Sequence, residues 1–442
     1  MPDQVRPARL RAGRTCRTGR LSTVIVERPP LRANREFWLL WVGQASSTLG
    51  SQSSVIAMPL LVLSLTGSPA QAGLVGFVGA GSAVVVLLPA GVLADRVDRR
   101  ALLRWCDAGQ AAAMAALALT LALGRPPLVE LLGLALATGS LSAFFIAAQS
   151  GAIRQVVARA DLPAAVARNQ AYRQAAVVGG PPLGGLLYAM AWPLPFLTDA
   201  VSYLLSYLTI TAIRIPLQES RKPPQPREPI RCRLLDGLRW IFGEPFLRAS
   251  VLYVAALNFV QPTLVLTVIV RASAHGATST AVGVMFALSG VGGVAGALAA
   301  PRIQRRWPPG AVLLTIGAIW ATAIPLLTTT THPIPLGVIL AALRFVIPSV
   351  NTIVVSYQMG VTPDRLQGQA YASMNLVASS SAPFGSLIGG FLLTAIGSTG
   401  ALLALTALTI TVVVAASAST ALRTGGRMSV AVERARHGTV AG

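Results

Sequence analysis

Charged side chains are scarce in this chain. They make up 12% of its 442 residues, whereas soluble proteins typically carry about 25%. Hydrophobic residues make up 53%, and the mean hydropathy is +0.64. From residue 37 to residue 94 there is no charged residue at all. This deficit excludes a soluble globular protein and indicates a chain that lies mostly in a lipid bilayer.

Acidic residues are fewer than basic ones: 15 Asp and Glu stand against 36 Lys and Arg, for a net charge of +21. Such an excess is typical of proteins that bind nucleic acid. Here, however, the arginines lie in the tails and in alternate loops instead of on one face of a domain. We therefore expect no nucleic-acid partner.

Lysine, cysteine and clustered acids are also scarce. Lys222 is the single lysine and does not follow a glycine, so ATP hydrolysis by a GxxxxGK[ST] loop is excluded. The three cysteines have neither CxxC nor metal-ligand spacing, so we expect no metal, no cofactor and no disulfide framework. A membrane transferase would need clustered aspartates, and the acids here are scattered, so we expect no enzyme. The cysteines are Cys16, Cys106 and Cys232.

Long apolar segments fill most of the remaining chain. A bilayer core of about 30 Å needs about 20 helical residues per crossing. This length predicts an all-α polytopic membrane protein with twelve transmembrane helices. The predicted segments are 37–64, 71–94, 101–123, 127–153, 168–190, 194–213, 246–270, 278–301, 310–330, 334–358, 368–395 and 398–421.

The arginines predict the orientation, since cytoplasmic loops carry the excess of basic residues. With the N-terminal tail inside, only Arg125 and Arg271 fall outside, and Arg344 falls within a span. We expect both termini in the cytoplasm of a bacterial cell, with the spans in its inner membrane. Residues 1–36 contain nine arginines and no apolar core of a signal peptide. They are expected to form a disordered cytoplasmic arm, or to precede the true start of translation.

A polar stretch divides the spans into six and six. Residues 215–245 begin as a Pro- and Arg-rich linker, and residues 234–242 have amphipathic spacing. We expect a short helix there, lying on the cytoplasmic membrane surface. The predicted domains are a six-helix bundle at 37–214, a second at 246–422, and a cytoplasmic tail at 423–442.

A charged turn follows the second predicted span. Residues 91–103, GVLADRVDRRALL, contain five charges after an uncharged run, and residues 296–307, GALAAPRIQRRW, repeat the pattern about 205 residues later. A repeated turn in this position indicates a duplicated bundle. The matched pairs are Gly91 with Gly296, Leu93 with Leu298, Ala94 with Ala299 and Arg100 with Arg305.

Twelve spans, the repeat and a GxLADRxxRR turn together resemble the major facilitator superfamily over about residues 37–422. REFWLLWVGQASSTLG at 35–50 and LTDAVSYLLS at 197–206 are similar to its enterobactin-exporter and macrolide-efflux branch. The resemblance implies two pseudo-symmetric six-helix bundles that transport a small molecule. Asp98 stands where the family more often has glycine.

The resemblance also implies a gating role for the charged turn. Asp95 would face the N-terminal end of the eleventh span, whose helix dipole favours an anion. It would thereby latch the two halves in the outward-open state. The arginines of this turn could instead serve only to set the topology. The expected gating residues are Gly91, Asp95, Arg96, Arg99 and Arg100.

The fifth span contains a GPxxGG sequence that is similar to the family's antiporter motif. Its residues are Gly180, Pro181, Gly184 and Gly185, although Ala176 replaces the motif's upstream glycine. Proline kinks a helix, and glycines four residues apart let another backbone approach. The same spacing recurs at Gly292 and Gly296 and at Gly385 and Gly389. In this family such faces pair the fifth span with the eighth and the second with the eleventh.

Ionisable residues inside spans are costly and therefore candidates for function. Arg344 lies near the middle of the tenth span and is expected to face the central cavity, pairing with an acid or an anionic substrate; a structural ion pair is the alternative. Asp199 could couple transport to protons or could only pack helices. Asp107 is expected to pair with Arg104 or a neighbouring arginine.

Uncharged polar residues on the lining spans are further cavity candidates, although each could instead bond a neighbouring helix. They are Gln44, Gln52, Gln149, Asn258, Gln261 and Asn351. A cavity with few charges suits a bulky amphipathic molecule.

These features predict a secondary active exporter, working as a monomer, of a drug-like, macrolide-like or siderophore-like molecule in exchange for protons. The alternative is an importer or facilitator of another small solute.

Overall fold

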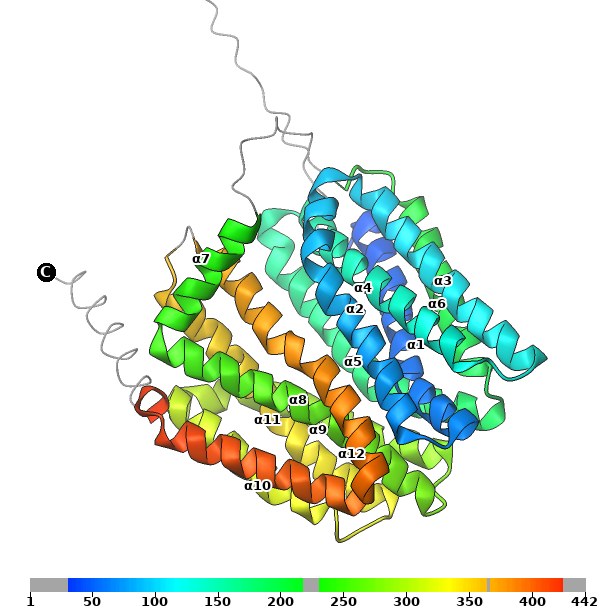
Figure 1. Cartoon of the computed structure of the whole chain (residues 1–442). Coiled ribbons are helices and arrows are strands. Elements are labelled where there is room, and N and C mark those ends of the chain that lie inside the picture. Colours follow the sequence, from blue (N-terminus) through cyan, green and yellow to red (C-terminus); the bar gives the residue numbers. More distant parts are fainter. Residues whose placement is uncertain (1–30, 218–229, 364–365, 424–442) are drawn as a thin grey trace, which may run out of the picture.

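The computed structural model describes residues 31–217, 230–363 and 366–423, and every regular element in these ranges is a helix (Figure 1). The α-helices are α1 (Arg35–Thr66), α2 (Pro69–Arg96), α3 (Arg99–Leu123), α4 (Leu128–Val156), α5 (Leu162–Met190), α6 (Leu194–Ala212), α7 (Ile230–Gly243), α8 (Pro245–Ala274), α9 (Ser279–Arg306), α10 (Pro309–Leu326), α11 (Pro333–Val361) and α12 (Gln367–Ala418). The predicted all-α membrane fold is confirmed.

The helix α12 consists of two helical segments joined at a kink. Gly397 has φ 69° and ψ 179°, which interrupts the helix between its two parts. A positive φ of this size favours glycine over any other residue. The parts before and after this break correspond to the last two predicted spans. Nine helices in the described ranges are long and apolar enough to cross a membrane, counting α12 once, which is consistent with twelve spans.

Short polar residues begin several helices. Asn34 accepts a hydrogen bond from the amide of Phe37, and Ser68 accepts one from Gln71. Asp98 does the same for Arg100 at the start of α3. Such caps satisfy amides that have no partner inside the helix. The departure at Asp98 from the family's usual glycine is therefore explained by helix capping.

The helices form two groups. α1 to α6 pack mainly on one another, and α8 to α12 do the same. The groups meet chiefly where α2 contacts α12 and where α5 contacts α9. We call the end of the molecule with the loops at 67–68, 124–127 and 191–193 the outer end, following the arginine distribution. The opposite end is the inner end.

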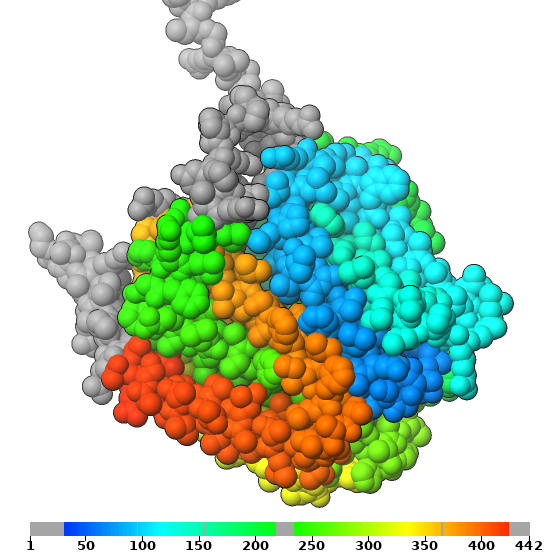
Figure 2. Space-filling view, viewed as in Figure 1, coloured from blue at the N-terminus to red at the C-terminus, as the bar shows by residue number. Residues whose placement is uncertain are grey.

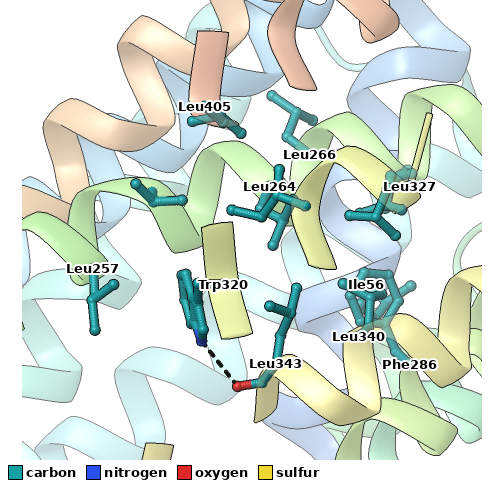
Figure 3. Close-up of a cluster of buried hydrophobic side chains, with 14 of the residues drawn as sticks. Ile56, Leu257, Leu264, Leu266, Phe286, Trp320, Leu327, Leu340, Leu343 and Leu405 are labelled. Atoms are coloured by element: carbon teal, nitrogen blue, oxygen red, sulfur yellow. Dashed lines mark hydrogen bonds between the residues drawn. The ribbon is translucent and has the colours of Figure 1, made fainter. Parts of the chain in front are cut away.

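The core of the second group surrounds Trp320. Its side chain is 2% exposed and lies among leucines of α8 and α11, including Leu257 and Leu343 (Figure 3). The indole Nε1 donates to the Leu343 carbonyl at 3.2 Å. A buried indole N–H needs such a partner, so this bond fixes α10 against α11.

Two expectations for polar segments need correction. Residues 31–36, placed in the disordered arm, are ordered: Leu31 and Asn34 are buried, and the Asn34 amide donates to the Val156 carbonyl at 2.9 Å. The rest of the arm lies outside the described residues. The amphipathic helix exists as α7, but its buried face packs on the protein: Ser373 of α12 donates to the Leu234 carbonyl, and Trp240 donates to Thr362.

Candidate functional site

The two helix groups approach most closely through glycines at the outer end. A methyl group on Gly73 of α2 would overlap the Ser386 carbonyl of α12, and one on Gly185 of α5 would overlap the Ser279 carbonyl of α9. Phe77 and Phe384 also pack across the first of these contacts, with ring centroids 5.7 Å apart. Figure 2 shows the α2 and α12 surfaces touching, and in Figure 1 the two ribbons converge at this end. The contacts form two seams that close the outer end.

The glycine pairs expected to form these seams pack elsewhere. Gly180 and Gly184 face Gln52 and Ser53 of α1. Gly292 and Gly296 face α11, and Gly385 and Gly389 face α8. The reason is helical geometry: residues four apart share one face, and the residue just beyond them turns by about 100° toward another neighbour. Gly185, Gly283 and Gly390 thus supply the seams.

The charged turn lies at the inner end. Arg100 donates to the Thr211 carbonyl at the end of α6, and the Arg99 guanidinium lies against Gly151 of α4. Arg96 is exposed, and Gly91 faces open space. The Asp95 side chain lies outside the described residues, so its expected latch role remains a prediction. The arginines of the turn thus tie α3 to α4 and α6.

Tyr172 joins two of the predicted cavity residues in a polar network. Its hydroxyl donates to Gln44 Oε1 at 3.2 Å and accepts from Gln149 Nε2 at 3.5 Å. Arg173 donates to Gln149 Oε1 at 3.4 Å. Trp41 packs edge-on to the Tyr172 ring. The network links α1, α4 and α5 and presents Arg173, which is exposed, at its rim.

The sequence alone did not single out Tyr172 or Arg173 as site residues. The sequence feature that could have identified them is an aromatic residue followed by an arginine, in a segment that continues into an apolar span. Their hydrogen bonds depend on how α5 packs against α1 and α4, and a linear pattern does not contain that information.

Arg344 lies in the middle of α11 and is only partly buried. Its guanidinium makes no hydrogen bond or ion pair with any described residue. Asn351, which is exposed, follows two helical turns later, so it lies on nearly the same face. The remaining candidates are dispersed: Asn258 donates to the Ala378 carbonyl of α12 at 2.7 Å, and Gln52 and Gln261 are half-buried.

Asp199 and Asp107 are fully buried at 2% and 0% exposure. Asp199 of α6 accepts a hydrogen bond from Ser54 of α1 at 2.8 Å. Asp107 of α3 has no hydrogen-bond partner on either oxygen among the described residues. The expected ion pair with Arg104 or a neighbouring arginine is therefore wrong. Arg104 is half-buried near the inner end, where its long side chain reaches water, whereas Asp107 turns toward α6.

Arg271 was expected in an outer loop, but the structure buries it at 6% exposure. It donates to the carbonyls of Thr328 and Thr330 at 2.6 and 2.9 Å, and to the Thr399 hydroxyl at 3.0 Å. These bonds tie the end of α8 to the α10–α11 loop and to the residues after Gly397. Arg271 thus stabilises the outer end of the second group.

Neither of two hollows that are lined by described residues contains a predicted cavity residue. The larger, of about 410 Å³, lies between α2 and α4 and includes Arg96. The smaller, of about 190 Å³, lies between α9, α10 and α11 and includes Trp307. In the described part of the chain, no three His, Cys, Asp or Glu side chains gather closely enough to hold a metal ion.

Comparison with known sequences decides the family. The profile of the Major Facilitator Superfamily matches residues 40–386. The chain belongs to the major facilitator superfamily. The superfamily is a class of membrane transporters, so this chain is a multi-pass membrane transporter with a small-molecule substrate.

Two superfamily relatives carry names related to efflux. The chain is 26% identical over 274 residues to the enterobactin exporter EntS of Shigella flexneri, covering 61% of this chain and 64% of that protein. It thus spans slightly less than two thirds of that relative. It is also 26% identical to the multidrug efflux pump Tap of Mycolicibacterium fortuitum, covering 80% of this chain and 88% of Tap.

Solved superfamily structures have the same fold. A bacterial homologue of the lysosomal transporter Spinster, in an inward-facing and unoccupied conformation, has a TM-score of 0.66 at 14% identity, covering 90% of this chain and 98% of that one. The nucleoside transporter NupG has a TM-score of 0.69 at 12% identity, covering 87% and 98%. At these identities the likeness shows the fold alone.

Proposed function

We propose that this superfamily member is a secondary active exporter of amphipathic small molecules and that protons drive it. The likeness to EntS and Tap supports export, because both are named for it. The GPxxGG sequence of α5 supports exchange, since Pro181 and Gly185 lie on the α5–α9 seam that must move during alternating access.

The single observation that carries the substrate class is Arg344. An unpaired cation in the middle of a membrane helix is costly, by about 2.5–3.5 kcal/mol on insertion scales. Its guanidinium has no partner among described residues and is partly accessible. Substrates with an anionic or strongly electron-rich oxygen would supply the missing partner. Arg344 and Asn351 then orient that group on the α11 side.

The Gln44–Tyr172–Gln149 network would contact the less charged part of the substrate. Its groups are amides and a phenol, and Trp41 lies beside them. Aromatic and amide side chains suit a ring-containing molecule that carries hydroxyl or carbonyl groups. A drug-like, macrolide-like or siderophore-like molecule with an acidic group would suit both Arg344 and this polar network.

The transport cycle uses the two helix groups as its halves, with the bundles at 37–214 and 246–422. The protein would lie as a monomer in a bacterial inner membrane, with both termini inside. In the conformation described here the seams close the outer end. In the conformation with the inner end closed, the N-terminal end of α12 would pack against Gly91, and Asp95 would face that helix end.

An efflux assay tests this proposal. A host that lacks its own pumps is loaded with a catecholate siderophore or a macrolide, with and without this gene. We expect the gene to lower retention of at least one probe, and a protonophore to abolish the effect. Higher uptake with the gene, insensitive to the protonophore, would instead establish a facilitator or importer.

A further inference from the structure

A column of buried hydroxyl groups runs along α6. Ser202, Tyr203, Ser206 and Thr209 are each at most 9% exposed, and with Asp199 they recur every three or four residues. That spacing places them on one face of the helix. The face packs on α1, where Gly43 and Gly50 lie directly against the hydroxyls of Thr209 and Ser202. The column is therefore sealed between two transmembrane helices.

Hydrogen bonds connect the outer part of this column. Ser54 of α1 donates to Asp199 Oδ2 at 2.8 Å, and Ser202 donates to Asp199 Oδ1 at 3.4 Å. Ser51 and the Tyr203 hydroxyl lie 2.8 Å apart. Both oxygens of Asp199 thus accept from hydroxyls, and hydroxyls can pass a proton as well as donate one.

The inner part of the column faces Asp107 of α3. The Ser206 hydroxyl is the group of α6 that faces this carboxyl, but neither forms a hydrogen bond of ordinary geometry with any described residue. Tyr203 lies within electrostatic reach of both Asp107 and Asp199. Asp199 and Ser206 are seven residues apart, about two helical turns or roughly 10 Å along α6.

The depth of the two acids matters. Asp199 is five residues after the outer start of α6, and Ser206, which faces Asp107, is six residues before its inner end. One carboxyl thus lies toward each side of the membrane, with Tyr203 between them. The column covers residues 199–209, roughly 15 Å along the middle of α6.

No positive group compensates these acids among the described residues. The titratable groups that face them are Asp107 and Cys106 from α3 and Asp199 and Tyr203 from α6, and α1 contributes only hydroxyls. Arg100 donates its hydrogen bond to a backbone carbonyl at the inner end of α6. Each carboxylate would lack compensation if it were ionised in so closed a place, so we expect each to hold a proton in this conformation.

We propose that Asp199 and Asp107 are the two ends of a proton pathway through α1, α3 and α6, separate from the surface that contacts substrate. The pathway rests on the proposal above that protons drive the transporter. A proton enters from water at one carboxylate oxygen, passes through the Tyr203 and serine hydroxyls, and leaves from the other carboxyl to water. No other reactant takes part. Opening of α6 against α1 or α3 would expose one end at a time.

Infrared spectroscopy of the purified protein in phosphatidylethanolamine–phosphatidylglycerol vesicles tests this pathway without any substrate. Near neutral pH we expect absorption by protonated carboxyl groups, with bands that shift in deuterium oxide. Asp199→Asn should remove one band and Asp107→Asn the other. Glu130→Gln, at the outer end of α4, should change neither.

The Tyr203→Phe variant distinguishes a connected proton pathway from two isolated buried acids. It keeps both carboxyls but removes the connecting hydroxyl, so both bands should remain while deuterium exchange of at least one slows by tenfold or more. If Asp199→Asn does not fold, Ser54→Ala should shift the Asp199 band without removing it. Absence of protonated-carboxyl bands in the wild type, bands that survive both Asp→Asn variants, or unchanged exchange in Tyr203→Phe would each overturn the inference. A failed efflux assay with these bands present would refute export and leave the pathway standing.

Discussion

Arg344 is the residue whose surroundings say most about the substrate. If its guanidinium binds an anionic group, Arg344→Ala removes a charge-assisted hydrogen bond worth about 1.5–3 kcal/mol. We expect the substrate concentration for half-maximal efflux to rise by roughly 10- to 150-fold. Arg344→Lys should have an intermediate effect, because lysine keeps the positive charge but lacks the planar guanidinium that donates two parallel hydrogen bonds. Kinetics of efflux in vesicles would measure this. A loss explained wholly by lower protein abundance would favour a structural role.

Arg271 has a structural role, in contrast to the substrate-binding role proposed for Arg344, because its hydrogen-bond partners are all within the protein. Arg271→Met would leave the carbonyls of Thr328 and Thr330 without this donor, at about 1–3 kcal/mol for each buried group. We expect a clear fall in the thermal unfolding temperature in detergent. Arg302→Met, at an exposed arginine near the inner end, is the matched control and should change little. Equal stability of both variants would contradict the structural role.

At the same scale, the sequence identified Asp199, Asp107 and Arg344, because an ionisable residue is conspicuous in an apolar span. It did not identify their partners. Ser51 and Ser54 meet α6 only through the register of two packed helices, and an isolated chain does not reveal that register. The wrong prediction that Asp107 pairs with Arg104 or a neighbouring arginine has the same origin, because residues that are close in sequence need not have side chains that meet in space.

At the scale of the helix, the seams depend on the absence of a side chain. A side chain on Gly73 would overlap the backbone of α12 at Ser386 and Gly390. Gly73→Val should therefore destabilise the conformation with the outer end closed, by about 1–3 kcal/mol for overpacking. The equilibrium between the outer-closed and outer-open conformations should shift toward the open one by roughly 5- to 150-fold. Thiol labelling at a single cysteine placed at Phe77 would measure accessibility of the seam.

Gly133→Val is the matched control for this seam, since Gly133 of α4 faces open space. We expect labelling at position 77 to rise only in the Gly73 variant. A similar rise in both, or in neither, would mean that the α2–α12 contact does not hold the outer end closed.

The helices themselves were largely predictable, because apolar length and charge-free runs mark spans clearly. Predicted segments and observed helices agree within a few residues at most ends. The least predictable feature was which glycine face meets which neighbour. Gly184 and Gly185 are adjacent in sequence yet pack on α1 and α9 respectively, and only the three-dimensional arrangement separates them.

At the scale of the whole molecule, we propose that the two helix groups rock about the α2–α12 and α5–α9 seams. The repeated charged turn and the 6+6 pattern of spans indicate such halves from the sequence alone. Nothing in the sequence indicates which end is closed. That information comes from the outer-end contacts of Gly73 and Gly185.

The most direct test of this rocking is a pair of distance measurements between spin labels in vesicles. With Cys16, Cys106 and Cys232 replaced by serine, one protein carries labels at exposed outer positions Arg125 and Thr329, and a second carries them at exposed inner positions Arg214 and Arg302. On a change of pH across the membrane or addition of an exported probe, we predict that the outer distance lengthens while the inner distance shortens. If both distances stay fixed, or both change in the same direction, the two groups do not rock about these seams.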